Sequence, residues 1–175
     1  RKQYLAELTK RSKNKKFVTD KMPQNFRYIA LICSAFPEAK IIHVKRNPAA
    51  TCWSNFKHYF AKGSLGFCYD LEDLVSYYEL YSDIMYFFER IYGKEIIQQD
   101  YDKLTICQET ETRRLLLYLG LDWENECLAP QNNKRIVRTA SQQQVRQRIY
   151  KGSSKDWEKY QPFLRGVFNR FKNQG

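Results

Sequence analysis

Short apolar runs rich in β-branched residues alternate along the chain with longer segments whose apolar residues recur at helical spacing. The short runs predict strands over residues 15–19, 40–44 and 94–98. The longer segments predict helices over residues 25–35, 48–60, 71–92 and 109–119. This alternation is typical of an α/β fold in which a parallel sheet is flanked by helices.

The longest predicted helix, over residues 71–92, carries one apolar stripe and becomes apolar nearly all round in its second half. We therefore expect the second half to be buried between other elements. The stripe consists of Leu71, Leu74, Val75, Tyr78, Tyr81, Met85 and Phe88. The strand over 40–44 is almost continuously β-branched, which predicts that both of its faces are covered.

Residues with strong capping preferences mark the ends of three helices. Asn25 can cap the helix over 25–35, and Asn47 followed by Pro48 is a favourable start for the next helix. Gly120 follows the last helix, where a left-handed residue is expected to close it.

The length of the chain, 175 residues with 43% hydrophobic residues, predicts a single domain over residues 1–175. No run of about 18 apolar residues is present that predicts a membrane span. Residues 1–16 lack the apolar centre and cleavage site of a signal peptide. The chain begins without Met, and Tyr4, Leu5 and Leu8 already stand at helical spacing, so we expect it to be part of a longer protein.

The formal net charge of +11 predicts a surface that attracts anions. Nucleic acid, an acidic glycan, an anionic lipid and a nucleotide cofactor all remain open as its partner. The basic residues are dispersed rather than aligned in a stripe, which disfavours nucleic acid even though the chain contains 11 Phe, 3 Trp and 13 Tyr.

The five cysteines are widely spaced and form no Cys-x-x-Cys pair, and the chain contains only two histidines. This composition predicts no metal site. It favours buried free thiols in a reducing compartment, hence the cytoplasm, although one disulfide remains open.

Ligands of parallel sheets bind beyond the carboxyl ends of the strands. Arg46 follows the strand over 40–44 and stands beside the start of the next helix, whose free amides attract anions. Ser54 is placed about two turns into that helix, on the face from which the helix started. Taken alone, these residues fit an ordinary strand-end arginine and helix serine better than an anion site.

Several blocks, spread over residues 17–165 at compatible spacing, resemble the sulfotransferase family, with most similarity to its tyrosylprotein branch and its bacterial repeat-associated branch. The first two blocks are residues 19–26 and residues 36–48, with Ser54 eight residues beyond Arg46. The resemblance implies a P-loop NTPase-like architecture and transfer of a sulfuryl group from 3′-phosphoadenosine 5′-phosphosulfate (PAPS) to an acceptor hydroxyl. It also implies that Arg46 and Ser54 bind the 3′-phosphate of PAPS and of the product 3′,5′-diphosphoadenosine (PAP).

Two later blocks extend the resemblance. Residues 100–104 resemble a segment whose tyrosine lies near the adenosine and the 3′-phosphate, which implies this position for Tyr101. Residues 138–157 resemble the C-terminal cofactor loop, which implies cofactor contacts for Lys151 and Gly152. The family has an arginine where this chain has Tyr150, so the first position of that loop departs from the family.

The resemblance also implies two residues at the transferring group. Lys21 aligns with a lysine that contacts this group in the tyrosylprotein branch, and Ser141 aligns with a serine in a supporting role. The first strand, the glycine-bearing loop that cradles the 5′-phosphosulfate and the acidic base have no counterpart in this chain. We expect them upstream of Arg1, and we expect the 175-residue chain alone to be inactive.

Two other functions are compatible with the sequence: a module that binds a 3′-phosphonucleotide without transfer, and a basic nucleic-acid-binding protein. Under the sulfotransferase interpretation the partners are a nucleotide donor and an acceptor that is a glycan, a tyrosine or a small alcohol. The acceptor pocket of the family is built from variable loops, here expected at residues 60–69 and in the upstream region.

Overall fold

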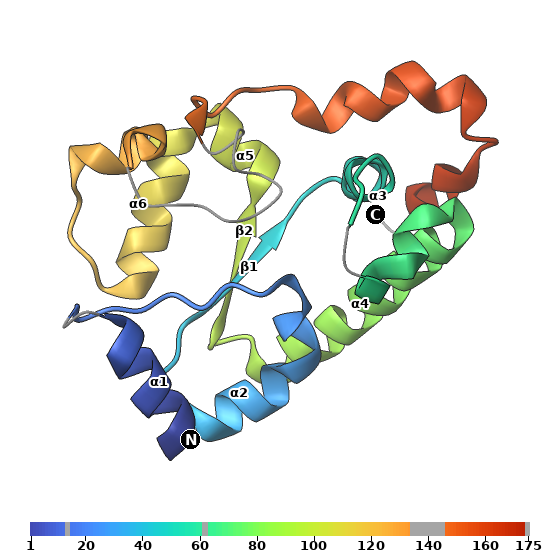
Figure 1. The fold of residues 1–175 in the computed structure, drawn as a ribbon. Coiled ribbons are helices and arrows are strands. Elements are labelled where there is room, and N and C mark those ends of the chain that lie inside the picture. The colour runs from blue at the N-terminus through green and yellow to red at the C-terminus, as the bar shows by residue number, and fades with distance from the viewer. Residues whose placement is uncertain (13–14, 61–62, 134–145, 174–175) are drawn as a thin grey trace. The chain divides into compact units, whose positions relative to one another are not determined.

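The computed structural model of the chain describes residues 1–12, 15–60, 63–133 and 146–173 (Figure 1). Its strands and α-helices, in chain order, are α1 (Lys2–Ser12), α2 (Ile29–Ala35), β1 (Ile41–Lys45), α3 (Pro48–Phe56), α4 (Leu71–Tyr92), β2 (Ile96–Asp100), α5 (Tyr101–Ile106) and α6 (Gln108–Leu119). Its 3₁₀ segments are η1 (Pro23–Tyr28), η2 (Gly63–Tyr69), η3 (Asn125–Leu128), η4 (Pro130–Asn132), η6 (Ser153–Phe163) and η7 (Val167–Asn173).

The chain divides into two compact units. The first unit comprises residues 1–41 and 80–96, and the second comprises residues 42–79 and 97–175. The prediction of one domain over the whole chain stays a prediction.

Strands β1 and β2 pair with each other and form a small parallel sheet flanked by helices, which confirms the predicted α/β class (Figure 1). Each strand begins one or two residues later than predicted. In β1 only His43 is buried, whereas Ile42 and Val44 are 38% and 56% exposed. The prediction that both faces of β1 are covered is therefore wrong, because alternate residues of a strand point to opposite faces and one of these faces is open.

The strand predicted over residues 15–19 does not form. Residues 15–22 lie outside any helix or strand, and the Phe17 side chain is 57% exposed. A β-rich run becomes a strand only when a neighbour pairs with its backbone, and in the described part of the chain β1 and β2 pair only with each other.

Helix α4 has the bounds that its apolar spacing predicted, and the predicted stripe is its buried side. Leu74, Val75, Met85 and Phe88 are all buried. The second half is not covered all round, however, because Leu80, Phe87 and Ile91 are 67%, 56% and 54% exposed. Apolar composition alone overestimated the burial of this helix.

The helix predicted over residues 25–35 is divided into η1 and α2. Its start lies at Pro23 rather than at Asn25, and the Asn25 side chain caps neither segment, because proline at the first position begins the helical turn two residues earlier. Helix α3 ends at Phe56 rather than near Phe60. Gly120 closes α6 with a left-handed φ of 67°, as predicted.

Each unit has its own apolar core. In the first unit the buried residues are Ile29, Met85, Phe88 and Ile96. In the second unit they are Ala49, Cys52, Trp53, Cys68, Leu74, Val75, Leu164, Val167 and Phe168. The second core joins α3 and the start of α4 to the C-terminal residues, so it fixes the C-terminal segment against the helix that follows β1.

The five cysteines are free thiols, but only Cys52 and Cys68 are buried. Burial raises the pKa of the Cys52 thiol to about 12 and that of the Tyr78 hydroxyl to about 12, so both groups are neutral at physiological pH. Within the described residues no helix is long and apolar enough to cross a membrane, and no group of three potential metal ligands is present.

Gln99 of β2 is 2% exposed, and its side chain ties the strand to α6. Its amide nitrogen donates to Glu111 Oε2 at 2.9 Å, and Arg114 Nη2 donates to Gln99 Oε1 at 3.2 Å. The hydrogen bond from Gln99, helped by Arg114, holds the pKa of the Glu111 carboxyl below its usual range. This network fixes the end of β2, from which α5 begins.

Replacing Asn47 by alanine should lower the free energy of unfolding by about 1 kcal/mol. The Asn47 side-chain oxygen accepts from the Ala50 amide at 2.9 Å and satisfies one of the free amides of α3. Urea denaturation measures the loss. Asn47→Ser keeps a capping oxygen and should retain most of the stability; equal losses in the two variants would contradict the capping role.

Candidate functional site

Arg46 occupies the junction between a strand and a helix. It directly follows Lys45, the last residue of β1, and precedes Asn47, the capping residue of α3. Its side chain is half-buried. The strand therefore fixes the backbone of Arg46 on one side and the capped helix fixes it on the other, so its direction is set by two regular elements.

The Arg46 guanidinium binds a turn that lies more than a hundred residues away in the sequence. Its Nε donates to Ser154 Oγ at 2.9 Å. Its Nη2 donates to the backbone oxygen of Ser153 at 2.7 Å and to Ser153 Oγ at 3.1 Å. Three hydrogen bonds thus join the end of β1 to the C-terminal segment.

Tyr101 forms one wall of this site. The guanidinium carbon of Arg46 lies 5.4 Å from the centre of the Tyr101 ring, within the range of a cation–π contact. Tyr101 is the first residue of α5, and Asp100 caps that helix by accepting from the Lys103 amide at 2.9 Å. Because β1 and β2 are parallel neighbours, their carboxyl ends bring Arg46 and Tyr101 together.

The charge of Arg46 is not matched by a carboxylate in the described part of the chain. Its hydrogen-bond partners are hydroxyl and carbonyl oxygens, and no described residue accepts from its Nη1. Arg170, by contrast, pairs with Glu72 and Glu79, and Arg113 pairs with Glu109. A half-buried guanidinium surrounded by neutral groups is suited to an anion with several oxygens, such as a phosphate.

Gly152 creates the turn that presents the two serines. Its φ of 89° lies in the left-handed region, where a side chain is strained, and it precedes the first turn of η6. Lys151 stands beside it and is exposed. Sequence reasoning missed Ser153 and Ser154, although two small hydroxyl residues after a glycine are a recognisable signal for a polar turn.

Aromatic packing fastens η6 to α3. The Tyr160 ring lies 4.6 Å from the Trp53 ring, centre to centre. Trp157 packs against the core of the second unit, with its ring 5.5 Å from that of Phe168. These contacts hold the Ser153–Ser154 turn in reach of Arg46.

The remaining predicted site residues are Ser54, Lys21 and Ser141. Ser54 is exposed on α3 and makes no hydrogen bond with Arg46 in the described structure. Lys21 is exposed and belongs to the first unit, just before η1. Ser141 lies outside the described residues. His43 lies in β1 and is buried.

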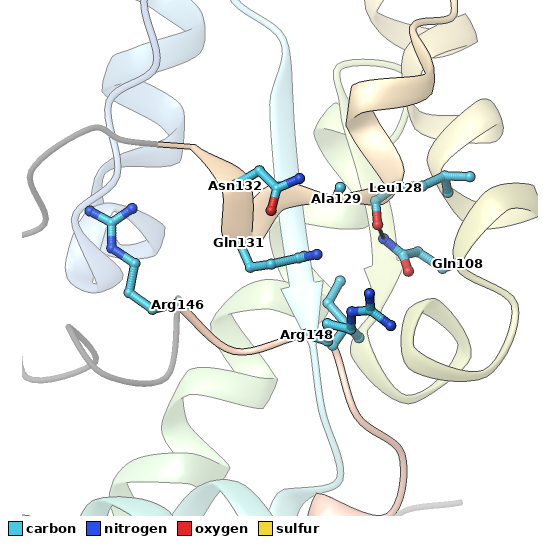
Figure 2. A pocket seen from close by; sticks show the side chains of 8 residues that line it. Gln108, Leu128, Ala129, Gln131, Asn132, Arg146 and Arg148 are labelled. Atoms are coloured by element: carbon cyan, nitrogen blue, oxygen red, sulfur yellow. Dashed lines mark hydrogen bonds between the residues drawn. The ribbon is translucent and has the colours of Figure 1, made fainter.

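A separate pocket of about 640 Å³ lies in the second unit, and none of the predicted cofactor residues lines it (Figure 2). Its walls come from the start of α6, from η3 and η4, and from the residues before Tyr150. The lining residues are Gln108, Leu128, Ala129, Gln131, Asn132, Arg146, Arg148 and Ile149.

Comparison with known proteins places the chain in a family. A model of the sulfotransferase family matches residues 1–125, which include Arg46, Ser54 and Tyr101. An uncharacterized protein of Aquifex aeolicus (strain VF5) is 36% identical over 166 residues, covering 94% of this chain. The chain spans 22% of the length of that relative. Since the family model matches well over half of the chain, the chain belongs to the sulfotransferase family.

Proposed function

We propose that the chain forms the nucleotide-binding part of an enzyme that transfers a sulfuryl group from PAPS to an acceptor hydroxyl. Family membership supports the reaction class. The observation that carries the choice of nucleotide is the Arg46 cluster, in which a guanidinium with neutral partners stands at a strand–helix junction beside an aromatic ring. The 3′-phosphate distinguishes PAPS from ordinary adenylates, and this cluster is suited to hold it.

In this proposal the residues near the cluster contact different parts of the nucleotide. Arg46 binds the 3′-phosphate, with Ser54 as a second donor. Tyr101, whose ring already lies beside Arg46, contacts the adenosine side of that phosphate. Lys151 and Gly152 belong to the turn that closes over it, and the amides at the start of α3 add partial positive charge.

The donor supplies an activated sulfuryl group, whose S–O bond to the 5′-phosphate breaks as the acceptor oxygen forms a new bond to sulfur. The proton of the acceptor hydroxyl passes to a base. Lys21 and Ser141 are proposed to donate hydrogen bonds to the oxygens of the transferring group. These hydrogen bonds stabilise the negative charge on those oxygens in the transition state. Most of the catalytic contribution of this chain is then positioning.

Isothermal titration calorimetry with PAP and with adenosine 5′-monophosphate tests the proposal. PAP should bind at least about tenfold more tightly, because only PAP carries the phosphate that Arg46 is proposed to bind. Equal affinities for the two nucleotides would exclude the 3′-phosphate site.

A turnover assay distinguishes the second candidate function, binding of the nucleotide without transfer, from the sulfotransferase function. A protein that contains this chain should release PAP from PAPS when a suitable acceptor hydroxyl is present. Tight binding of PAP together with no consumption of PAPS over glycan, tyrosine and small-alcohol acceptors would favour the binding module.

A further inference from the structure

The pocket of about 640 Å³ has the volume of a site for a small organic ligand (Figure 2). It is built from the start of α6, from η3 and η4, and from residues 146–149. Gln108 Nε2 donates to the backbone oxygen of Leu128 at 3.1 Å and thereby fixes η3 against α6. The wall that carries Gln108 is therefore held in place by a hydrogen bond, as the close view shows.

The polar groups of this pocket are cationic or neutral. Two arginines and three side-chain amides line it, and none of its lining residues is acidic. Arg146 donates to the backbone oxygen of Asn133, so part of its guanidinium is engaged. Arg148 forms no hydrogen bond or ion pair with any described residue, and its guanidinium lies in the pocket with Gln108 and Gln131 (Figure 2). Arg148 is thus the group best placed to receive an anion.

The amides supply hydrogen bonds in both directions. The side chains of Gln131 and Asn132 bind no described residue, and the amide oxygen of Gln108 has no described donor. A carboxamide both donates and accepts, which is also true of a sugar hydroxyl. Three such groups around one cavity can therefore satisfy several neighbouring hydroxyls.

We propose that this pocket, rather than the loop at residues 60–69, binds the acceptor, and that the acceptor is a saccharide that carries a carboxylate or sulfate group; this rests on the proposed sulfotransferase function. Arg148 binds the acidic group, and Gln108, Gln131 and Asn132 bind hydroxyls. A peptide held along its backbone is the less suitable ligand, because that kind of recognition uses a free strand edge, an apolar groove or an aromatic-lined groove. The lining of this pocket includes no aromatic residue and no strand.

The test compares two disaccharides by calorimetry at low ionic strength. The acidic probe joins glucuronate to N-acetylglucosamine, and the neutral probe is chitobiose. The chain should bind the acidic probe at least about tenfold more tightly, because only this probe forms a charge-assisted hydrogen bond with Arg148. Equal binding of the two probes would overturn the proposal.

Arg148→Gln should weaken binding of the acidic probe about tenfold and leave binding of the neutral probe unchanged. Arg148→Lys keeps the charge and should retain part of the preference. Arg90→Gln removes the same charge from the first unit, where Arg90 lies over the Tyr86 ring, and should change neither value. If Arg148→Gln binds the acidic probe like the unmodified chain while its thermal unfolding is unchanged, the pocket is not the acceptor site.

Parallel titrations with PAP separate this proposal from the one on which it rests. If the chain binds PAP but its saccharide binding does not depend on Arg148, the assignment of the pocket is overturned and the nucleotide site is unaffected. If the unmodified chain does not bind PAP but its saccharide binding depends on Arg148, the nucleotide site is overturned instead. Arg148-dependent binding of an acidic tyrosine peptide, with neither disaccharide bound, overturns the saccharide class.

Discussion

Replacement of Arg46 by glutamine is expected to weaken the binding of PAP by about 10- to 100-fold. A charged hydrogen bond to a phosphate is worth about 1.5 to 3 kcal/mol, and glutamine keeps a donor but loses the charge. Arg46→Lys should recover only part of the affinity, because an ammonium group cannot reproduce the planar fork of a guanidinium. Calorimetry with PAP measures both variants.

Arg27 provides the matched control for this experiment. It is an exposed arginine over the ring of Tyr28, 5.9 Å from its centre, and it belongs to the first unit. Arg27→Gln removes one charge and one cation–π contact, as Arg46→Gln does, and should leave PAP affinity unchanged. Binding of adenosine 5′-monophosphate should be equal in both variants. If Arg46→Gln binds PAP as tightly as Arg27→Gln does, the assignment of the 3′-phosphate to Arg46 is wrong.

The largest loss of stability is expected from Trp53→Ala, which should cost about 3 to 5 kcal/mol. Trp53 is 9% exposed, and its ring contacts those of Phe56 and Tyr160 at 5.9 and 4.6 Å. The truncation leaves a cavity between α3 and η6. Because η6 carries the serines that bind Arg46, we expect PAP affinity to fall together with stability. Urea unfolding followed by fluorescence and circular dichroism measures the change.

Two further variants test the reason for this loss. Trp53→Phe keeps a ring and removes the buried indole N–H, which finds no acceptor among the described residues, so it should cost less than about 1.5 kcal/mol. Leu117→Ala truncates a side chain that is 82% exposed and should stay within about 0.5 kcal/mol of the unmodified chain. A Trp53→Ala variant no less stable than Leu117→Ala would show that Trp53 does not hold the C-terminal segment.

The features that the sequence predicted well depend on local signals. Helix α4 has its predicted bounds because its apolar spacing persists over six turns, and Gly120 closes α6 because a left-handed residue is needed there. The capping side chain of Asn47 and the proline after it likewise act within one helical turn. Such signals are complete within a short window of sequence.

The features that the sequence predicted wrongly depend on distant partners. Residues 15–19 have the composition of a strand but no neighbouring strand in the described chain. Ile42 and Val44 are apolar whether or not another element covers their face of β1. Composition specifies what a segment is able to pair with or pack against, and only the tertiary arrangement provides the partner.

The candidate site shows the same division. Arg46 was singled out because it follows a strand, whereas Tyr101 was implied by the family resemblance. The two lie together because parallel strands bring such positions to one edge of the sheet. Ser153 and Ser154 were missed because no periodicity relates them to a residue 107 or 108 positions earlier. Helical spacing predicts on which face of α3 the Ser54 side chain lies, but it does not predict whether that side chain contacts Arg46.

The serine contacts of Arg46 also affect which solutes the site accepts. Hydroxyl and carbonyl oxygens already engage Nε and Nη2, so an incoming group that binds these two nitrogens must replace the serine contacts. A neutral solute would replace one set of uncharged acceptors with another and gain almost nothing. A doubly charged group gains the difference between an ionic and a neutral hydrogen bond. Replacement of the serine contacts is therefore favourable only for a strongly charged anion.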